Sequence, residues 1–232
     1  MSQPFPSRRL GCGLVSRRFA LGGLAGVAVL ALPGCAAYER YSLVEVVRRL
    51  LQLSADRAFA RLLAPGGFWD DQLARLALPE QFGRKGDVLQ RLLSGPLLRD
   101  RLQRAFNDMA GRAAYNAAPA VAEAIRGVGL RNAQALIAGR PDEATTYLRG
   151  EMAGRLIDIM VPQLGDALRL SNDPLVAEAL AVVTGVDVGG LANTLAAQAD
   201  DAIWRAIGRE EAAIRADPRA TGDPLLMRAF GR

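Results

Sequence analysis

Apolar side chains recur at three- and four-residue spacings along almost the whole chain, and this pattern constrains the fold more than any other feature. From about residue 42 to 64, for example, Leu43, Val46, Val47 and Leu50 share one face while charged residues occupy the others. This spacing places the apolar residues on one side of an α-helix. No segment shows the sustained two-residue alternation that a half-buried strand requires. The chain is therefore predicted to be all-α.

Prolines, glycines and aspartates predict where further helices begin and end. Pro96 suits the first turn of a helix that runs to about Ala118. Asp142 can cap a longer helix, which Pro162 is expected to kink or end. Aspartate-proline pairs open two more helices, at 173–174 and 223–224. The remaining predictions are short helices over 88–93, 121–128 and 131–138, a turn within 182–190, and a long helix over 188–216.

The chain after its N-terminal region reads as one domain. Residues 43–232 contain no internal repeat, low-complexity tract or linker. We expect a single compact multi-helix bundle whose helices pack through their apolar stripes. Leu102 and Ile159 lie near the middle of two of these stripes and are predicted core positions.

The first thirty-four residues read as an export signal. Arginine pairs at 8–9 and 17–18 precede an uncharged run over 19–33 that is too short to span a bilayer. Residues 16–21 (SRRFAL) resemble the twin-arginine export motif, and the Gly-rich, mildly apolar run behind them suits that route. Export by the general secretory route is the alternative.

Residues 32–35 (LPGC) resemble the lipobox of bacterial lipoproteins, in which the cysteine thiol is acylated and the chain is cut just before it. This resemblance implies a signal peptide over 1–34, lipidation of Cys35, and a lipidated N-terminal tether over 35–42. Ala36 is not the aspartate associated with inner-membrane retention, so the periplasmic side of the outer membrane is the expected location. The alternatives are an ordinary signal-peptidase cut that releases a soluble periplasmic protein, and an uncleaved membrane anchor.

Removal of the signal changes the charge balance. The whole chain has 29 basic and 24 acidic residues, but residues 1–34 hold four arginines and no acid, which leaves 25 basic against 24 acidic residues. A mature domain so close to neutrality gives no electrostatic reason to expect nucleic-acid or bulk anionic-membrane binding. We therefore expect no nucleic-acid partner.

The residue types that are missing exclude several chemistries. The chain has no histidine, and its two cysteines are Cys12, within the signal, and Cys35. Hence the mature domain has no disulfide, and its 198 residues must rely on an apolar core. Ser-His-Asp and Cys-His nucleophiles, zinc sites with His or Cys ligands, and His-held haem are excluded as well. We expect no cofactor, and catalysis would depend on carboxylates, Tyr, Lys85, hydroxyls or a hard cation.

Several short stretches are similar to successive landmarks of the bacterial domain-of-unknown-function family 4197. The likeness spans roughly Val44 to Gly231 and includes residues 112–114, 135–139, 144–148, 201–204, 210–211 and 214–215. It implies an exported, mostly helical protein, but no activity. The family-like positions that we take as candidates for a surface or ligand site are Arg112, Tyr147, Glu210, Glu211 and Arg215.

The charged and aromatic motifs favour structural roles. Adjacent acids at 70–71, 200–201 and 210–211 point about 100° apart on a helix, so a pair cannot converge on one bond as general acid and base. These pairs are predicted to be solvated. Glu211 and Arg215, at i and i+4, are predicted to form an exposed ion pair worth about 0.3 kcal/mol. Tyr147 is predicted to be a half-buried packing residue. Phe68, Trp69 and Phe82 are predicted to plug the core under a loop, with a ligand pocket or a partner-binding surface as the alternative.

These observations favour a non-catalytic envelope component that binds a protein or an apolar ligand. The alternative is a carboxylate-dependent hydrolase that acts on cell-wall material. Such an enzyme needs two acids about 5 to 9.5 Å apart in a cleft. The arrangement of acids in a concave pocket is therefore the observation that separates the two hypotheses.

Overall fold

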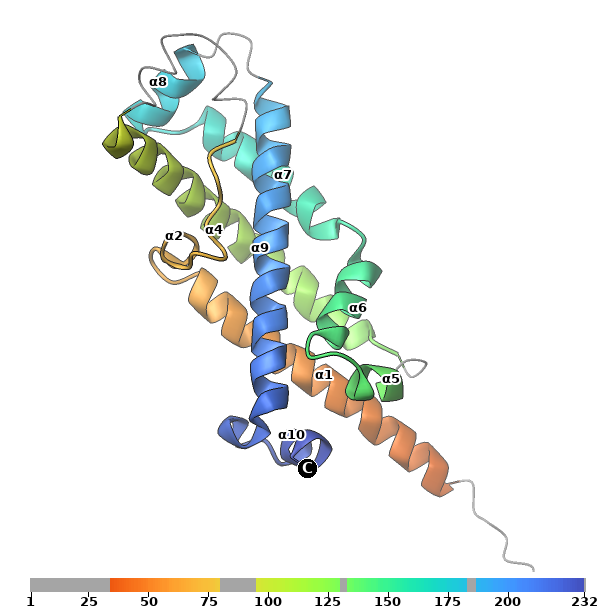
Figure 1. Ribbon diagram of the computed structural model, residues 1–232. Helices are drawn as coiled ribbons and strands as arrows, with labels where there is room; N and C mark the ends of the chain where they lie inside the picture. The colour runs from red at the N-terminus through yellow and green to blue at the C-terminus, as the bar shows by residue number, and fades with distance from the viewer. Residues whose placement is uncertain (1–33, 80–94, 130–132, 183–186, 232) are drawn as a thin grey trace, which may run out of the picture. The chain divides into compact units, whose positions relative to one another are not determined.

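The computed structural model describes residues 34–79, 95–129, 133–182 and 187–231. Within these ranges all regular structure is helical, which confirms the predicted all-α class. Figure 1 shows the helices, which are α1 (Gly34–Leu62), α2 (Gly67–Asp70), α4 (Pro96–Gly127), α5 (Ala133–Ala138), α6 (Glu143–Met152), α7 (Arg155–Arg169), α8 (Pro174–Val182), α9 (Val188–Ala216), a 3-10 turn (Pro218–Thr221) and α10 (Pro224–Phe230). None of these helices is long and apolar enough to cross a membrane.

Helix α9 is the centre of the bundle. It packs against α1 on one side and α7 on another, and α4 contacts both α1 and α7 (Figure 1). The apolar residues predicted to form its stripe are all fully buried, from Leu191 and Leu195 to Ile203, Ile207 and Ile214. This stripe is part of one apolar core to which α1, α4, α6 and α7 also contribute, and burial of such a core is the main driving force for folding. The short helices α5, α6 and α10 each contact α1, and α6 also contacts α9.

Helix α4 is longer than predicted. It continues from Pro96 to Gly127 with Pro119 in its interior, and so it joins the helix predicted to end at 118 with the one predicted over 121–128. Proline removes one helical hydrogen bond and usually ends a helix. Here the buried stripe continues at four-residue spacing through Ala117, Val121 and Ile125. Burial of that face outweighs the lost hydrogen bond.

The long helix predicted after Asp142 is interrupted before Arg155, and not at Pro162 as was predicted. Helix α6 ends before Ala153 and Gly154, whose φ angles are 43° and 84°, and α7 begins at Arg155. The left-handed conformation at both residues ends α6, and Gly154 adopts it without strain. Pro162 lies inside α7, because the buried face of α7 continues across it from Leu156 to Leu168.

Other predicted boundaries agree with the structure. Helix α8 follows Asp173 and α10 follows Asp223, and each aspartate accepts a backbone N–H of its first turn. Helix α9 has the predicted bounds. Helix α1 starts at Gly34, before the predicted residue 42. The predicted signal residues 1–33, the helix over 88–93 and most of the turn within 182–190 lie outside the described residues.

Candidate functional site

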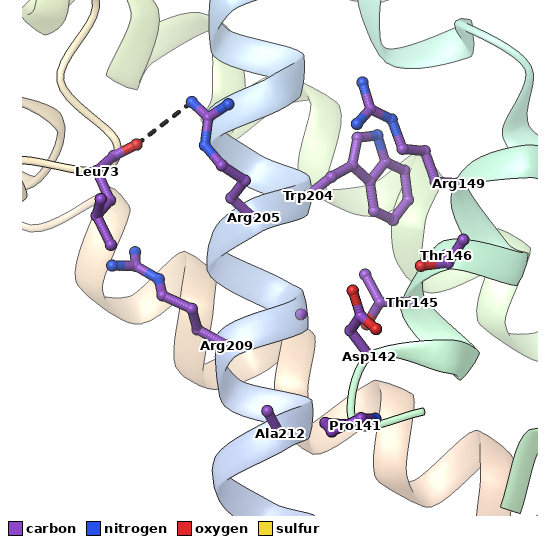
Figure 2. A pocket seen from close by; sticks show the side chains of 11 residues that line it. Leu73, Pro141, Asp142, Thr145, Thr146, Arg149, Trp204, Arg205, Arg209 and Ala212 are labelled. Atoms are coloured by element: carbon purple, nitrogen blue, oxygen red, sulfur yellow. Dashed lines mark hydrogen bonds between the residues drawn. The ribbon is translucent and has the colours of Figure 1, made fainter. Parts of the chain in front are cut away.

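A groove lies on the C-terminal half of α9, over residues 204–212. We call it the α9 groove and define it by Leu73, Asp142, Thr146, Arg205, Gly208 and Ala212. Its volume is about 520 Å³ and its walls are mainly apolar. Figure 2 shows that the segment after α2 and two arginines border it on one side of α9, and the N-terminal half of α6 on the other. The volume alone lies within the range of ligand pockets.

Gly208 forms the floor of the α9 groove. A Cβ atom at this position would lie 3.4 Å from Asp142 Cβ and 3.9 Å from Thr145 Cγ2, which are ordinary contact distances. Packing of α6 on α9 therefore does not require glycine. Glycine within a helix costs about 1 kcal/mol relative to alanine. The groove floor has room for one methyl group at this position.

A buried polar cluster supports one wall of the groove. The Asp200 carboxylate is 5% exposed and accepts hydrogen bonds from Trp204 Nε1 (2.8 Å) and Arg149 Nη2 (2.9 Å). Arg149 also pairs with Asp201. Burial raises the pKa of Asp200, and the bonds from Trp204 and Arg149 oppose that shift. The prediction that this acid pair is solvated is wrong for Asp200, which instead orients Trp204 and Arg149 at the groove.

The opposite wall carries Arg209 and Arg205, one turn apart on α9. Arg209 binds Asp71 through two nitrogens, at 3.2 and 2.5 Å. This bond is the main reason that the pKa of Asp71 lies below its ordinary value. Hence Asp71, too, is not the purely solvated acid that was predicted. Arg205 is exposed and donates one hydrogen bond to the Leu73 carbonyl at 3.3 Å (Figure 2).

Glu211 and Arg215 form a buried pair, so the predicted exposed ion pair is wrong. Their side chains are 0% and 9% exposed, and Arg215 Nη2 lies 2.7 Å from Glu211 Oε1. Glu211 also accepts the backbone N–H groups of Ala144 (3.1 Å) and Thr145 (2.7 Å), and the Thr145 hydroxyl (2.6 Å). These N–H groups belong to the first turn of α6 and have no partner within their own helix. Glu211 therefore caps α6 from α9.

Arg215 caps a second helix. Its Nη1 and Nη2 donate to the Ile137 and Leu136 carbonyls of α5 at 2.8 and 2.7 Å. Its guanidinium also lies 4.8 Å from the Phe230 ring of α10. The pair thus joins the end of α5 and the start of α6 to α9. This is a structural role, and neither Glu211 nor Arg215 lines the α9 groove.

The other candidate positions are dispersed. Glu210 pairs with Arg61 of α1 at 2.6 Å, and its side chain is 12% exposed. Arg112 is exposed and borders a separate groove between the end of α1 and α4. Tyr147 is half-buried, as predicted, and lines a third groove, of about 230 Å³. The five family-like positions therefore do not form one site.

The aromatic prediction agrees with the structure for Phe68 and Trp69, and Phe82 lies outside the described residues. Phe68 and Trp69 are 2% and 9% exposed. The Arg75 and Arg104 guanidinium carbons lie 4.3 and 4.7 Å from the centroid of the Trp69 ring, at the distance of cation–π contacts. Asn107, which sequence reasoning missed, is buried and fixes the segment after α2 through the Leu76 backbone. The only sequence feature that could have indicated this role is an amide side chain among apolar residues on one helix face.

Acidic residues do not converge in the grooves described. The α9 groove has Asp142, a groove between α1 and α4 has Asp56, and the two remaining grooves have Asp108 and Glu151, one acid in each lining. In the described part of the chain no three acidic, Cys or His residues are grouped as a metal would need. The α9 groove instead offers guanidinium groups, hydroxyls and an apolar floor, which suit binding.

Comparison with known proteins identifies the family of this chain. No curated protein and no solved structure matches the chain significantly. The family model described as "Protein of unknown function (DUF4197)" matches residues 37–231. This match covers most of the chain and all the helices that form the α9 groove, so the chain belongs to the DUF4197 family.

Proposed function

We propose that this protein is a cell-envelope lipoprotein whose helical domain is a non-catalytic binding module. In this proposal the lipid on Cys35 holds the domain on the periplasmic side of the outer membrane, and the domain takes up a protein segment or an apolar ligand. The LPGC sequence at 32–35 supports the anchor. The α9 groove supports the binding function.

The single observation that carries the binding proposal is the composition of the α9 groove. Its volume of about 520 Å³ lies within the range of ligand pockets, and its mainly apolar walls are bordered by a few polar groups. The polar groups are pre-organised, because Arg149 is held by Asp200, and Arg209 by Asp71. Pre-organisation lowers the entropic cost of binding.

The same groove gives little support to a carboxylate-dependent hydrolase. Asp142 is its one acidic residue. A glycosidase needs a second carboxyl group about 5 to 9.5 Å away to act as nucleophile or base. Asp200, whose pKa is raised, is engaged by Trp204 and Arg149 and does not line the groove.

Blocking the groove should remove the bound ligand or partner. Thr146 is exposed on the groove wall, so Thr146→Trp fills the groove without disturbing the core. Lipidated wild-type protein purified from its own envelope should carry a ligand or partner that mass spectrometry detects, and Thr146→Trp should lose it. Ala213→Trp is the matched control, because Ala213 is exposed on α9 but does not line the groove. Equal recovery from both variants would contradict the proposal.

Cys35→Ser should release the protein from the membrane. The substitution removes the thiol that lipoprotein processing acylates, and no other cysteine follows it. Detergent partitioning and fractionation should move the protein from the membrane to the soluble periplasmic fraction. If the distribution is unchanged, the lipid anchor is excluded and an ordinary signal cut or an uncleaved anchor takes its place.

A further inference from the structure

A second groove lies between α1 and α4. Figure 1 shows these two helices side by side and running in opposite directions, and they contact each other. The groove has a volume of about 560 Å³ and mainly apolar walls, and it shares no lining residue with the α9 groove. We call it the α1–α4 groove and define it by Gln52, Asp56, Ala60, Tyr115, Asn116 and Ala122. It is therefore a candidate binding surface in its own right.

Small side chains and one exposed aromatic ring form the apolar part of the α1–α4 groove. Ala60, Ala118 and Ala122 line it and add little bulk to the two helices. Tyr115 lines it as well, is 68% exposed, and is the most exposed aromatic side chain of the described residues. Tyrosine is enriched among the residues that carry most of the binding energy of protein interfaces. The apolar part of the groove therefore suits a protein surface that packs on Tyr115.

The polar side chains of the α1–α4 groove are left mainly with acceptors. Gln52 Nε2 donates to Asp56 Oδ1 at 2.8 Å, and Asn116 Nδ2 donates to Gln163 Oε1 at 2.5 Å. Each amide thus directs an N–H at a neighbouring side chain, and its oxygen remains to accept a hydrogen bond. A partner of this groove must supply the donors.

Charge and backbone add to this excess of acceptors. Asp56 is the one charged residue in the lining, and within the described chain it accepts only from Gln52. Pro119 has no N–H, so the Tyr115 carbonyl, one turn earlier, lacks its usual helical donor. A partner that complements this groove therefore brings an apolar face and a cationic donor, which is a Lys or Arg side chain.

The geometry favours a helix over an extended segment. Helices α1 and α4 use nearly all their backbone groups internally, so the groove offers no strand edge. An extended segment would leave its own N–H and C=O groups unpaired on the apolar walls, whereas a helix satisfies them internally. The lining residues of α1 run from Gln52 to Leu63, a length of about 16 Å, or about three turns of a helix.

We propose that the α1–α4 groove docks an amphipathic helix of a partner protein. The apolar face of that helix packs on Ala60, Ala118 and Ala122 and against the Tyr115 ring, and its Lys or Arg side chain pairs with Asp56. The helix lies along α1 and α4 as an added member of the bundle. This surface goes beyond the proposed function, because it is separate from the α9 groove.

Photo-cross-linking in intact cells identifies the occupant. p-Benzoylphenylalanine at residue 60 places the reactive group in the groove, because Ala60 is exposed in the lining. It should cross-link to a segment of another protein that has apolar residues at three- and four-residue spacings and a Lys or Arg beside them. The same group at residue 213, which is exposed on α9 and lines none of the four grooves, is the matched control. A cross-link to lipid, to a second copy of this chain or to a segment without this pattern, or none above the control, would overturn the proposal.

Affinity measurements test which residues hold the helix. The cross-linked segment, synthesised as a fluorescent peptide, should bind the full mature protein and become helical by circular dichroism. Tyr115→Ala should raise the Kd of this peptide ~10-fold or more, because it removes the exposed aromatic anchor. Asp56→Lys should raise the Kd ~5-fold, and high salt should reduce that difference, since Asp56 is exposed.

Two substitutions on α4 are the matched controls. Leu97→Ala removes an exposed apolar side chain and Asp100→Lys reverses an exposed charge, and neither residue lines any of the four grooves. Both should leave the Kd of the peptide unchanged. Tyr115→Ala and Asp56→Lys change exposed side chains, so their melting temperatures should match that of the wild type. If neither of them raises the Kd, or if the bound peptide is not helical, the proposal is wrong.

Thr146→Trp separates the two grooves. It blocks the α9 groove but should leave the cross-link at residue 60 intact, because the grooves share no lining residue. If it abolishes that cross-link, the α1–α4 groove is not a separate surface and the inference fails. If residue 60 gives no cross-link while Thr146→Trp still removes the envelope ligand, the helix inference fails and the proposed binding function stands.

Discussion

Glu211→Ala should lower the free energy of unfolding by about 3 to 5 kcal/mol. The substitution leaves the Arg215 guanidinium buried without its counter-charge, and breaking a buried pair from one side is costly for that reason. It also leaves the N–H groups of Ala144 and Thr145 without an acceptor at the start of α6. Chemical denaturation of the mature domain, followed by circular dichroism, measures this loss.

Two variants separate the buried pair from surface electrostatics. Glu211→Gln keeps an acceptor for the α6 N–H groups but removes the charge, so its cost should lie below that of Glu211→Ala. Asp166→Ala breaks an exposed pair with Arg169 at 3.6 Å, and it should cost well under ~1 kcal/mol. A loss for Glu211→Ala as small as that for Asp166→Ala would show that the buried network does not stabilise the domain.

The error about Glu211 and Arg215 shows what helical spacing leaves open. A separation of four residues predicts that two side chains meet, but not whether they meet in solvent. The apolar spacing of α9 already indicated that Glu211 is buried. Glu211 is four residues after Ile207 and three before Ile214, and both isoleucines are fully buried. A charge on the apolar stripe of a long helix indicates a buried partner.

Local chemistry explains why much of the fold could be predicted. Helices α4, α8 and α10 each start with a proline in the first turn, and an aspartate precedes that proline in α8 and α10. The residues that fix these helix starts are neighbours in sequence and can be recognised without the structure. The bounds of α9 follow from its own apolar period. The break at Ala153 and Gly154 was not predicted, because Pro162 is the stronger helix-breaking residue in the sequence. In the structure the buried face of α7 continues across Pro162, so the helix does not end there.

The α9 groove could not be predicted, because it joins residues that are far apart in sequence. Leu73, Asp142 and Arg205 belong to three segments, and only the packing of α6 and of the segment after α2 on α9 brings them together. Gly208 was the available sequence signal. A glycine in the interior of a 29-residue helix carries a propensity cost, and such a cost indicates either close packing or a site.

Leu102→Ala should destabilise the domain by about 2 to 5 kcal/mol. Leu102 is 2% exposed on α4, a helix that packs against α1 and α7, so truncation removes buried apolar surface and leaves a cavity. Ile159, which was predicted to be an equivalent core position, is only half-buried at the edge of the core. Its substitution by alanine should therefore cost clearly less than that of Leu102.

Denaturant midpoints of the two variants test this ranking directly. Without a disulfide, the bundle depends on contacts between stripes, so the loss for Leu102→Ala should appear as a lower midpoint with an unchanged slope. Leu97→Ala is a control on the same helix, because Leu97 is 82% exposed and should leave the midpoint nearly unchanged. Equal midpoints for Leu102→Ala and Leu97→Ala would mean that the face of α4 turned toward α1 and α7 is assigned wrongly.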